Sequence, residues 1–164
     1  MRSVLWSSVV VVSAALLACS PPTTLQPEVD AGPMTAPDGG SLPMLELGTG
    51  TQNFAPFTDG QMAQVIAGPQ GGFHVWAAAR ARAPLDPMLI RLTVKVTLNG
   101  SELSSTDYRV NLVKNGSAFE WYAMTALVPD PAAVRGQRTT LELTATDSAG
   151  RTATDSRTVI PFGP

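Results

Sequence analysis

The chain has 164 residues, a formal net charge of −2 at pH 7, one cysteine and one histidine. With Cys19 as the only cysteine, no disulfide can form within the chain, and Cys19 and His74 together are too few nitrogen and sulfur ligands for a zinc site. The 11 basic residues form no cluster, which argues against nucleic acid as a partner.

The first eighteen residues have the layout of a secretory leader. Arg2 and the amino terminus supply positive charge, an apolar stretch runs from Val4 to Leu17, and the small residue Ala18 precedes Cys19. As a helix this stretch would be about 21 Å long, shorter than the ~30 Å hydrocarbon core of a bilayer. We therefore expect residues 1–18 to be a signal peptide and not a permanent transmembrane span.

The segment Leu16-Leu17-Ala18-Cys19 resembles the lipobox of bacterial lipoproteins. The resemblance implies cleavage between Ala18 and Cys19, a diacylglyceryl group on the thiol and an N-acyl chain on the new amino terminus, with no other cofactor. Two or more acyl chains hold a protein stably in a membrane. Ser20, where an aspartate would retain the protein in the inner membrane, implies the outer membrane of a Gram-negative cell. The alternative is an ordinary cleaved leader with Cys19 as an incidental thiol.

Residues 19–43 are expected to form a disordered tether that begins with the lipidated Cys19. The 24 residues from Ser20 to Pro43 hold six prolines and three glycines and no aromatic residue, too little apolar surface to offset the entropy of ordering. Fully extended as polyproline II, they would reach about 75 Å. Such a segment is either a spacer that lifts a domain off the membrane or a linker with no selected length.

Residues 44–164 have the size of a single domain. Arg2 lies in the leader and three acids lie in the tether, so the 11 basic and 13 acidic residues of the chain become 10 and 10 in this domain. A neutral domain gives no electrostatic reason to lie flat on anionic lipid.

Period-two alternation of apolar and polar residues predicts most of the domain to be β-strand. Ile90 to Leu98 is the clearest case, and it ends at a turn, Asn99-Gly100. A second strand, Asp107 to Leu112, leads to a hairpin turn at Asn115-Gly116. The returning strand, Phe119 to Met124, is apolar on both faces, so we expect it to be central.

The end of the domain repeats this pattern. Thr140 to Thr146 alternates, Asp147 to Gly150 turns the chain, and Arg151 to Ile160 returns as a threonine-rich strand expected at a solvated edge. The remaining predicted elements are three weaker strands and at most one helical turn: Leu45–Gly48, Met62–Ala67, Phe73–Arg82 and Pro131–Val134.

These elements predict an all-β fold, a single two-sheet antiparallel sandwich of seven or eight strands. Leu141 to Val159 resembles the closing hairpin of bacterial immunoglobulin-like domains, which implies that fold without its usual disulfide. Trp76 stands where such a fold would place a core tryptophan. The run from Gly68 to Trp76 also resembles a segment of uncharacterised lipoproteins of myxobacterial type, a resemblance that implies no activity.

Few residues suggest catalytic chemistry. His74 is interpreted as a structural strand histidine; the alternative, a Ser-His-Asp site, would need a serine from a distant loop, and no Gly-x-Ser-x-Gly motif is present. Acidic residues such as Asp86, Glu102, Asp107 and Glu120 are expected on scattered turns and solvated strand faces, unlike the paired carboxylates of a glycosidase.

Two binding hypotheses stay open. Asp130 and Asp147 lie at predicted loop ends and could bind calcium if the loops met, although no Asp-x-Asp spacing supports this. His74, Trp76, Trp121 and Tyr122 are candidate ligand-facing residues, and the two aromatic neighbours could offer a platform for a sugar. Adjacent strand residues point to opposite faces, so Trp121 and Tyr122 cannot share one surface, and packing is the favoured role for Trp121.

The sequence thus favours a non-enzymatic, lipid-anchored protein of the cell envelope with a binding or structural domain. Its expected partners are membrane lipid through Cys19 and another envelope or extracellular protein or glycan. The alternative is a small hydrolase or carbohydrate-binding accessory module that uses the loops at one end of the sandwich.

Overall fold

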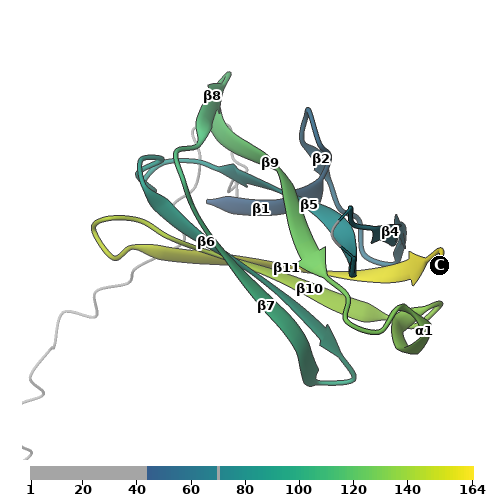
Figure 1. The fold of residues 1–164 in the computed structure, drawn as a ribbon. Coiled ribbons are helices and arrows are strands. Elements are labelled where there is room, and N and C mark those ends of the chain that lie inside the picture. Colours follow the sequence, from purple (N-terminus) through teal and green to yellow (C-terminus); the bar gives the residue numbers. More distant parts are fainter. Residues whose placement is uncertain (1–43, 70) are drawn as a thin grey trace, which may run out of the picture. The chain divides into compact units, whose positions relative to one another are not determined.

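The computed structural model describes residues 44–69 and 71–164, and the predicted leader, Cys19 and the predicted tether lie outside them. The described residues form two β-sheets packed as a sandwich (Figure 1). Sheet A has the strand order β2-β1-β5-β9-β8, with β4 also paired to β5. Its strands are β1 (Leu45–Thr49), β2 (Ala55–Pro56), β4 (Ile66–Ala67), β5 (Phe73–Ala81), β8 (Val113–Asn115) and β9 (Ala118–Leu127).

Sheet B has the strand order β3-β11-β10-β6-β7. Its strands are β3 (Gln61–Gln64), β6 (Ile90–Leu98), β7 (Ser101–Val110), β10 (Thr139–Thr146) and β11 (Thr152–Phe162). The helix of the described residues is the single turn α1 (Pro131–Val134), which begins at Asp130, whose carboxylate accepts hydrogen bonds from the amides of Ala132 and Ala133. This side-chain cap and Pro131 at the first helical position account for the turn.

The predicted all-β two-sheet sandwich is confirmed. Eight of its strands have four or more residues, and β2, β4 and β8 have two or three. The order β1-β5-β9-β8 in one sheet and β11-β10-β6-β7 in the other corresponds to strands A-B-E-D and G-F-C-C′ of an immunoglobulin-type sandwich. One pair departs from the expected antiparallel pattern, because β3 runs parallel to β11. The chain reaches β3 by crossing over from sheet A, so no hairpin imposes an antiparallel direction.

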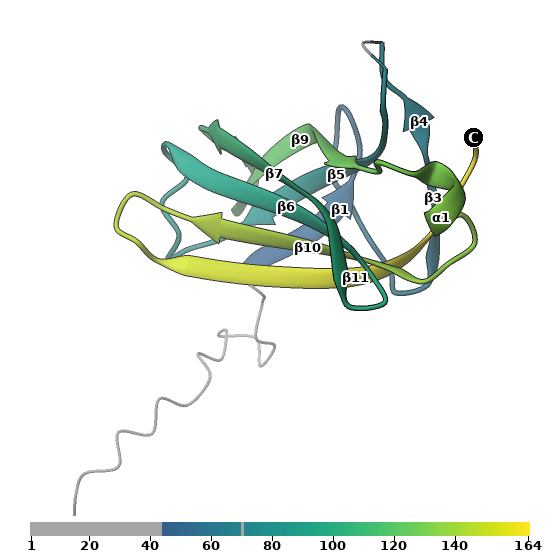
Figure 2. The ribbon, with the colours of Figure 1, turned by 60° about the horizontal axis from the view of Figure 1, so that its bottom comes forward.

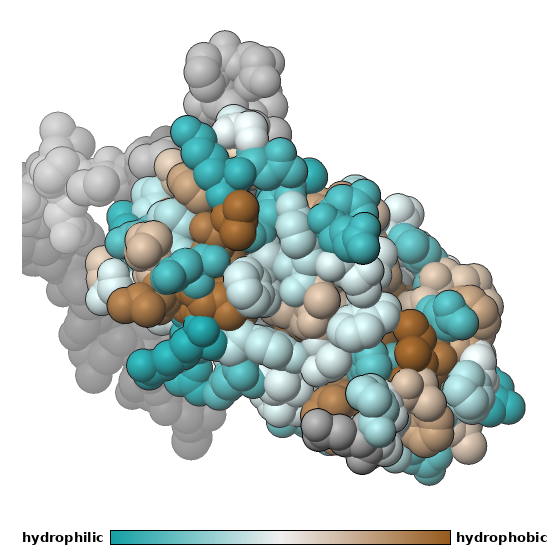
Figure 3. Space-filling model, turned by 45° about the horizontal axis from the view of Figure 1, so that its top comes forward, coloured by the Kyte–Doolittle hydropathy of each residue, from teal (hydrophilic) through white to brown (hydrophobic). Residues whose placement is uncertain are grey.

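The core lies between the sheets and follows the alternation in the sequence. From β6, the side chains of Ile90, Leu92, Val94 and Val96 are fully buried, while Arg91 between the first two is exposed. A fully buried Leu or Ile contributes ~1.5–3 kcal/mol relative to an exposed one. With apolar groups directed inward, the face seen in Figure 3 is mostly hydrophilic, and its hydrophobic residues form separate patches.

Four predicted elements differ in detail. The strand expected from Met62 to Ala67 is two strands, β3 in sheet B and β4 in sheet A. The strand expected from Asp107 to Leu112 ends at Val110, and the chain crosses to sheet A, where β8 forms the Asn115-Gly116 hairpin with β9. The expected central strand, β9, has β5 on one side but only the three-residue β8 on the other. The expected edge strand, β11, is an edge from Thr152 to Thr158, because β3 pairs only with its last residues.

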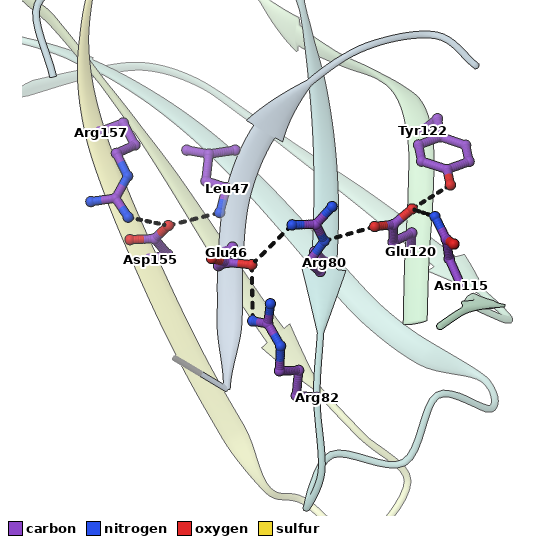
Figure 4. Close-up of polar contacts among 9 residues, drawn as sticks. All are labelled: Glu46, Leu47, Arg80, Arg82, Asn115, Glu120, Tyr122, Asp155 and Arg157. Atoms are coloured by element: carbon purple, nitrogen blue, oxygen red, sulfur yellow. Dashed lines mark hydrogen bonds and ion pairs between the residues drawn. The ribbon is translucent and has the colours of Figure 1, made fainter. Parts of the chain in front are cut away.

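Side chains of sheet B close the open edges of sheet A. One open edge is the part of β9 that β8 does not cover. There the hydroxyl of Tyr108, on β7, accepts a hydrogen bond of 2.8 Å from the amide of Thr125 and lies 2.7 Å from Thr125 Oγ1. On the opposite edge, Asp155 Oδ2 accepts a hydrogen bond of 2.7 Å from the amide of Leu47 and pairs with Arg157 (Figure 4). Edge groups that lack a neighbouring strand are thus hydrogen-bonded across the sandwich.

The two ends of the sandwich carry different features (Figures 1 and 2). At the entry end, the amide of Arg82 donates to the carbonyl of Met44, so the described chain enters beside the β5–β6 loop. The β7–β8 connection and the β10–β11 turn lie at this end too. The far end carries β3, β4, α1 and the carboxyl terminus.

Candidate functional site

A gap in sheet A opens at the far end of the sandwich. Both β1 and β4 pair with the same edge of β5, through Gly48 with Ala78 and Ile66 with His74. Trp76 lies between these two pairs, and Thr49 Oγ1 donates a hydrogen bond of 2.9 Å to its carbonyl. The interruption leaves one stretch of the β5 edge uncovered by either short strand.

A pocket of about 280 Å³ occupies this gap and continues toward β3. Its lining residues are all uncharged. They are the aromatic Phe57, Trp76 and Phe162, the polar Thr49, Gln61 and Gln64, and the aliphatic Met62, Ala63, Ile66 and Val75. Met62 and Phe162 are 55% and 40% exposed, so large apolar side chains stand at the mouth. An uncharged lining of aromatic and amide groups suits a neutral ligand that has both apolar and hydrogen-bonding groups.

Trp76 does not belong to the core, and the prediction of a core tryptophan is wrong. On β5, Val75, Ala77 and Ala79 point into the core, which places the residues between them on the outer face. Trp76 is therefore half-buried on the outer side of sheet A, where it contacts His74 and lines the pocket. Small alanines on the inner face take the place of a large core residue.

His74 lies beside Trp76 on the same outer face of β5. Its side chain is 6% exposed, and the two rings meet edge to face with 4.4 Å between their centroids. Burial lowers the pKa of the imidazole, which favours the neutral form at pH 7. Within the described part of the chain, Nε2 has no hydrogen-bond partner. His74 does not line the pocket, although its ring contacts the ring of Trp76, which does.

The outer face of sheet A carries a network of six polar residues (Figure 4). We call it the outer-face network; its members are Glu46, Arg80, Arg82, Asn115, Glu120 and Tyr122. Glu120 is 1% exposed and accepts hydrogen bonds from Arg80 Nε, Asn115 Nδ2 and the Tyr122 hydroxyl. The expectation that Glu120 lies on a solvated strand face is therefore wrong. Three donors that meet on one carboxylate compensate for its burial.

The network fixes the charge state of Glu120. Burial alone would raise its pKa, but the hydrogen bonds from Tyr122, Asn115 and Arg80, with the charge of Arg80, outweigh burial and lower the pKa. The same contact raises the pKa of the Tyr122 hydroxyl, because ionisation would place a second negative charge beside the carboxylate. Arg80 also lies over the ring of Phe54, 4.1 Å from its centroid. Each member is thus held by others.

A loop crosses the outer face above β5. The carbonyl of Gly50, just after β1, accepts a hydrogen bond of 3.0 Å from the amide of Ala123 on β9. Because β1 and β9 lie on opposite sides of β5, this loop passes over β5, which accounts for the complete burial of Ala78. Gly48 has no room for a side chain here, since a Cβ would lie 2.3 Å from the carbonyl oxygen of Ala55.

A bulge in β9 determines where its aromatic residues point. The register with β5 shifts between Trp121 and Met124, and Ala123 has a φ of 55°. Trp121 consequently faces inward, half-buried against the core, and Tyr122 faces outward into the outer-face network. The structure brings Tyr122 to Glu120 and not to Trp121, Trp76 or the pocket.

The calcium hypothesis for Asp130 and Asp147 is wrong. The eight residues of β10 separate the two, so one caps α1 at the far end and the other lies at the entry end, roughly 26 Å of strand away. Asp147 accepts hydrogen bonds from the amide of Asp86 and from Arg151. These contacts lower its pKa to about 2, with the Asp86 amide making the largest contribution. Residues 44–69 and 71–164 hold no group of three potential metal ligands.

Sequence reasoning identified Trp76 but missed the pocket around it. The residues that line the pocket come from β1, β3, β4, β5 and the end of β11. No pattern within any one of these segments predicts that they meet. The exposed Met62 in a predicted strand and Phe162 beyond the last predicted strand were the available indications. No helix in the part of the chain that the structure describes is long and apolar enough to span a bilayer.

Comparisons with known proteins identify no family. No protein-family model matches the chain, and no curated protein matches it. Among solved structures, the CooA pilin subunit from enterotoxigenic Escherichia coli is similar over 74% of this chain and 100% of the pilin chain. The two share 10% sequence identity with a TM-score of 0.32, a likeness too distant to carry a functional argument.

Proposed function

We propose that the chain is a lipid-anchored protein of the bacterial cell envelope whose β-sandwich has a non-enzymatic binding role. The observation that carries this proposal is the placement of the pocket. The described chain enters the sandwich beside Arg82 at one end, and the pocket with Met62 and Phe162 at its mouth lies at the other. A domain attached through its entry end presents the far end to its surroundings.

The anchor is proposed from the sequence. The lipobox-like segment ending in Cys19 supplies the attachment, with diacylglycerol and an N-acyl chain on Cys19 as the only covalent groups. Ser20 favours the outer membrane of a Gram-negative cell. The residues between Cys19 and Met44 then link the anchor to the domain, and the pocket is offered to an envelope or extracellular protein or glycan.

The chemistry of the buried acids supports binding over catalysis. A general acid that works near neutral pH needs a raised pKa, as burial without partners provides. Glu120 and Asp147 instead accept several hydrogen bonds each, and their pKa values are lowered. His74 packs against Trp76 outside the pocket lining. These groups are committed to holding strands and loops together.

Leader processing tests the anchor. A Cys19→Ser variant should retain its leader, because the processing of lipoproteins requires the modified cysteine, and should therefore migrate as a larger species on a gel. Removal of the leader from this variant at the same rate as from the unchanged chain would contradict the proposal.

Surface variants test the binding role. Photocrosslinking in intact envelopes, with the pocket-mouth variant Phe162→Lys, should lose the component captured by the unchanged protein. Leu127→Lys, 42% exposed and outside the pocket lining, is the matched control and should keep it. Equal capture by both variants, or turnover of a substrate by the purified protein, would count against a binding role at the pocket.

A further inference from the structure

The entry end exposes three large apolar side chains on two adjacent segments. Met88 and Leu89 are 54% and 70% exposed at the end of the β5–β6 loop, and Val113, at the start of β8, is 59% exposed. Leu89 also has a φ of 51°. A left-handed backbone is unfavourable for a bulky residue, and exposure of leucine to water is unfavourable as well. Two costs at one residue suggest that this loop is displayed for contact.

The two segments are held rigidly. The amide of Leu89 donates 2.8 Å to Asn111 Oδ1, and the amide of Leu112 donates 2.9 Å to the carbonyl of Pro87. Asp86 Oδ1 accepts from the amide of Met88. The exposed apolar side chains therefore lie on segments that hydrogen bonds tie to one another.

Unpaired positive charge flanks this surface. Arg109 and Lys114 are exposed, and among the described residues neither forms an ion pair. Of the neighbouring acids, Asp107 is paired with Arg91 and Asp147 with Arg151. Asp86 accepts hydrogen bonds from the Met88 amide and the Ser148 hydroxyl and keeps its charge, so among the residues that the structure describes two unpaired cations face one unpaired anion here. The left side of Figure 3, which is this end of the domain, shows hydrophobic residues beside hydrophilic ones. The neutral charge of the whole domain conceals this local excess.

We propose that this entry tip, formed by Met88, Leu89 and Val113 with Arg109 and Lys114, rests on the anionic lipid surface of the membrane that carries the anchor. The inference depends on the proposed lipid anchor. An exposed apolar surface flanked by cations fits the boundary between headgroups and acyl chains, where apolar groups enter and Lys or Arg meet anionic headgroups. Lipid is favoured over a partner protein because the chain that leads to the proposed anchor enters the domain at this end.

The contact would orient the domain. With the entry tip on the membrane, the long axis of the sandwich stands away from the lipid, and the pocket at the far end faces outward. The tether supplies proximity, since a surface contact that is weak alone is strengthened when a linker keeps the two partners together.

Two methionines at opposite ends provide a matched test. Met88→Cys and Met62→Cys replace residues that are 54% and 55% exposed, and each thiol is labelled with an environment-sensitive fluorophore. The mature protein, extracted from membranes, is added to preformed vesicles that contain phosphatidylglycerol. We expect the emission of the label at position 88 to shift to the blue and its quenching by acrylamide to fall by more than half. The label at position 62 should stay accessible to acrylamide.

The same samples are floated on a density gradient to separate the two proposals. If the protein floats with the vesicles and acrylamide quenches both labels, the proposed contact of the entry tip with lipid is wrong and the lipid anchor is still supported. Protein that does not float would overturn the anchor and the inference with it. If the label at position 88 is shielded from acrylamide without vesicles, the surface is a contact between copies of the chain and the lipid contact is wrong. Equal shielding on vesicles of phosphatidylcholine alone would show that the contact does not depend on anionic headgroups.

Charge reversal completes the test. The double variant Arg109→Glu, Lys114→Glu should float as before but expose the label at position 88 to acrylamide. Arg135→Glu with Arg138→Glu, two exposed cations at the far end, is the charge-matched control and should leave the label shielded. Equal behaviour of the two double variants would contradict the role of Arg109 and Lys114.

Discussion

The Tyr108 hydroxyl offers a sharp test of how the two sheets are held together. It accepts a hydrogen bond from the Thr125 amide at 2.8 Å and lies 2.7 Å from Thr125 Oγ1. Tyr108→Phe keeps the ring and removes both contacts, together with the hydrogen bond of 3.2 Å that the hydroxyl donates to the Thr125 carbonyl. It also leaves an edge amide of β9 without its acceptor. A lost hydrogen bond with a partly buried donor left unsatisfied costs about 2 kcal/mol. This is a substantial part of the ~5–15 kcal/mol that stabilises a domain.

The matched control lies two residues away on the same strand. Thr106 Oγ1 is buried and has no hydrogen-bond partner among the described residues. Thr106→Val therefore removes an unsatisfied hydroxyl, and we expect the free energy of unfolding to stay unchanged or to rise by up to ~1 kcal/mol.

Urea unfolding followed by tryptophan fluorescence measures both variants. Tyr108→Phe should move the midpoint to lower urea with an unchanged slope, since the surface exposed on unfolding stays the same. If Tyr108→Phe is as stable as the unchanged protein, or as stable as Thr106→Val, then the hydroxyl does not join the sheets and the account of the closed edge is wrong.

Three further predictions concern sheet A and the entry end. Ala123→Gly should stabilise the domain by up to ~1 kcal/mol in thermal melts, because glycine adopts the φ of 55° without strain; a loss of stability would contradict a strained bulge. Glu120→Gln should destabilise by ~2–3 kcal/mol because Arg80 loses a buried charged partner, whereas the exposed Glu102→Gln should change stability by less than ~0.5 kcal/mol; equal effects would refute the network. The pKa of Asp147 is lowered from 3.8 to about 2, so its ionised carboxylate adds to the free energy of unfolding. This contribution is complete above about pH 5 and is lost as the pH falls from there to about 2. Asp147→Asn should flatten this part of the urea midpoint against pH, and an unchanged profile would contradict the assignment.

The alternation of apolar and polar residues predicted the strands, because a strand with one buried face has an apolar residue at every second position. Ile90 to Leu98 matches β6 residue for residue, and Pro131 to Val134 matches α1. The alanines at the middle of β5 favour helix weakly, yet they lie fully buried in a strand, because packing between sheets outweighs a propensity of less than ~1 kcal/mol per residue.

What could not be predicted depends on residues distant in the sequence. Glu120 is buried because Arg80, 40 residues earlier, reaches it from the neighbouring strand. The side on which Trp76 lies depends on which face of β5 meets sheet B, and a strand with small residues on one face and mixed residues on the other leaves this open. The pocket and the parallel β3 arise from one crossover whose destination no turn residue specifies.

The intact mass of the protein extracted from membranes tests the central claim most directly. The account predicts a polypeptide that begins at Cys19 and carries the additional mass of a diacylglyceryl group and an amide-linked acyl chain. A water-soluble product with an unmodified thiol at Cys19 would contradict the anchor, the linking role of the residues that follow it, and the contact of the entry tip with lipid.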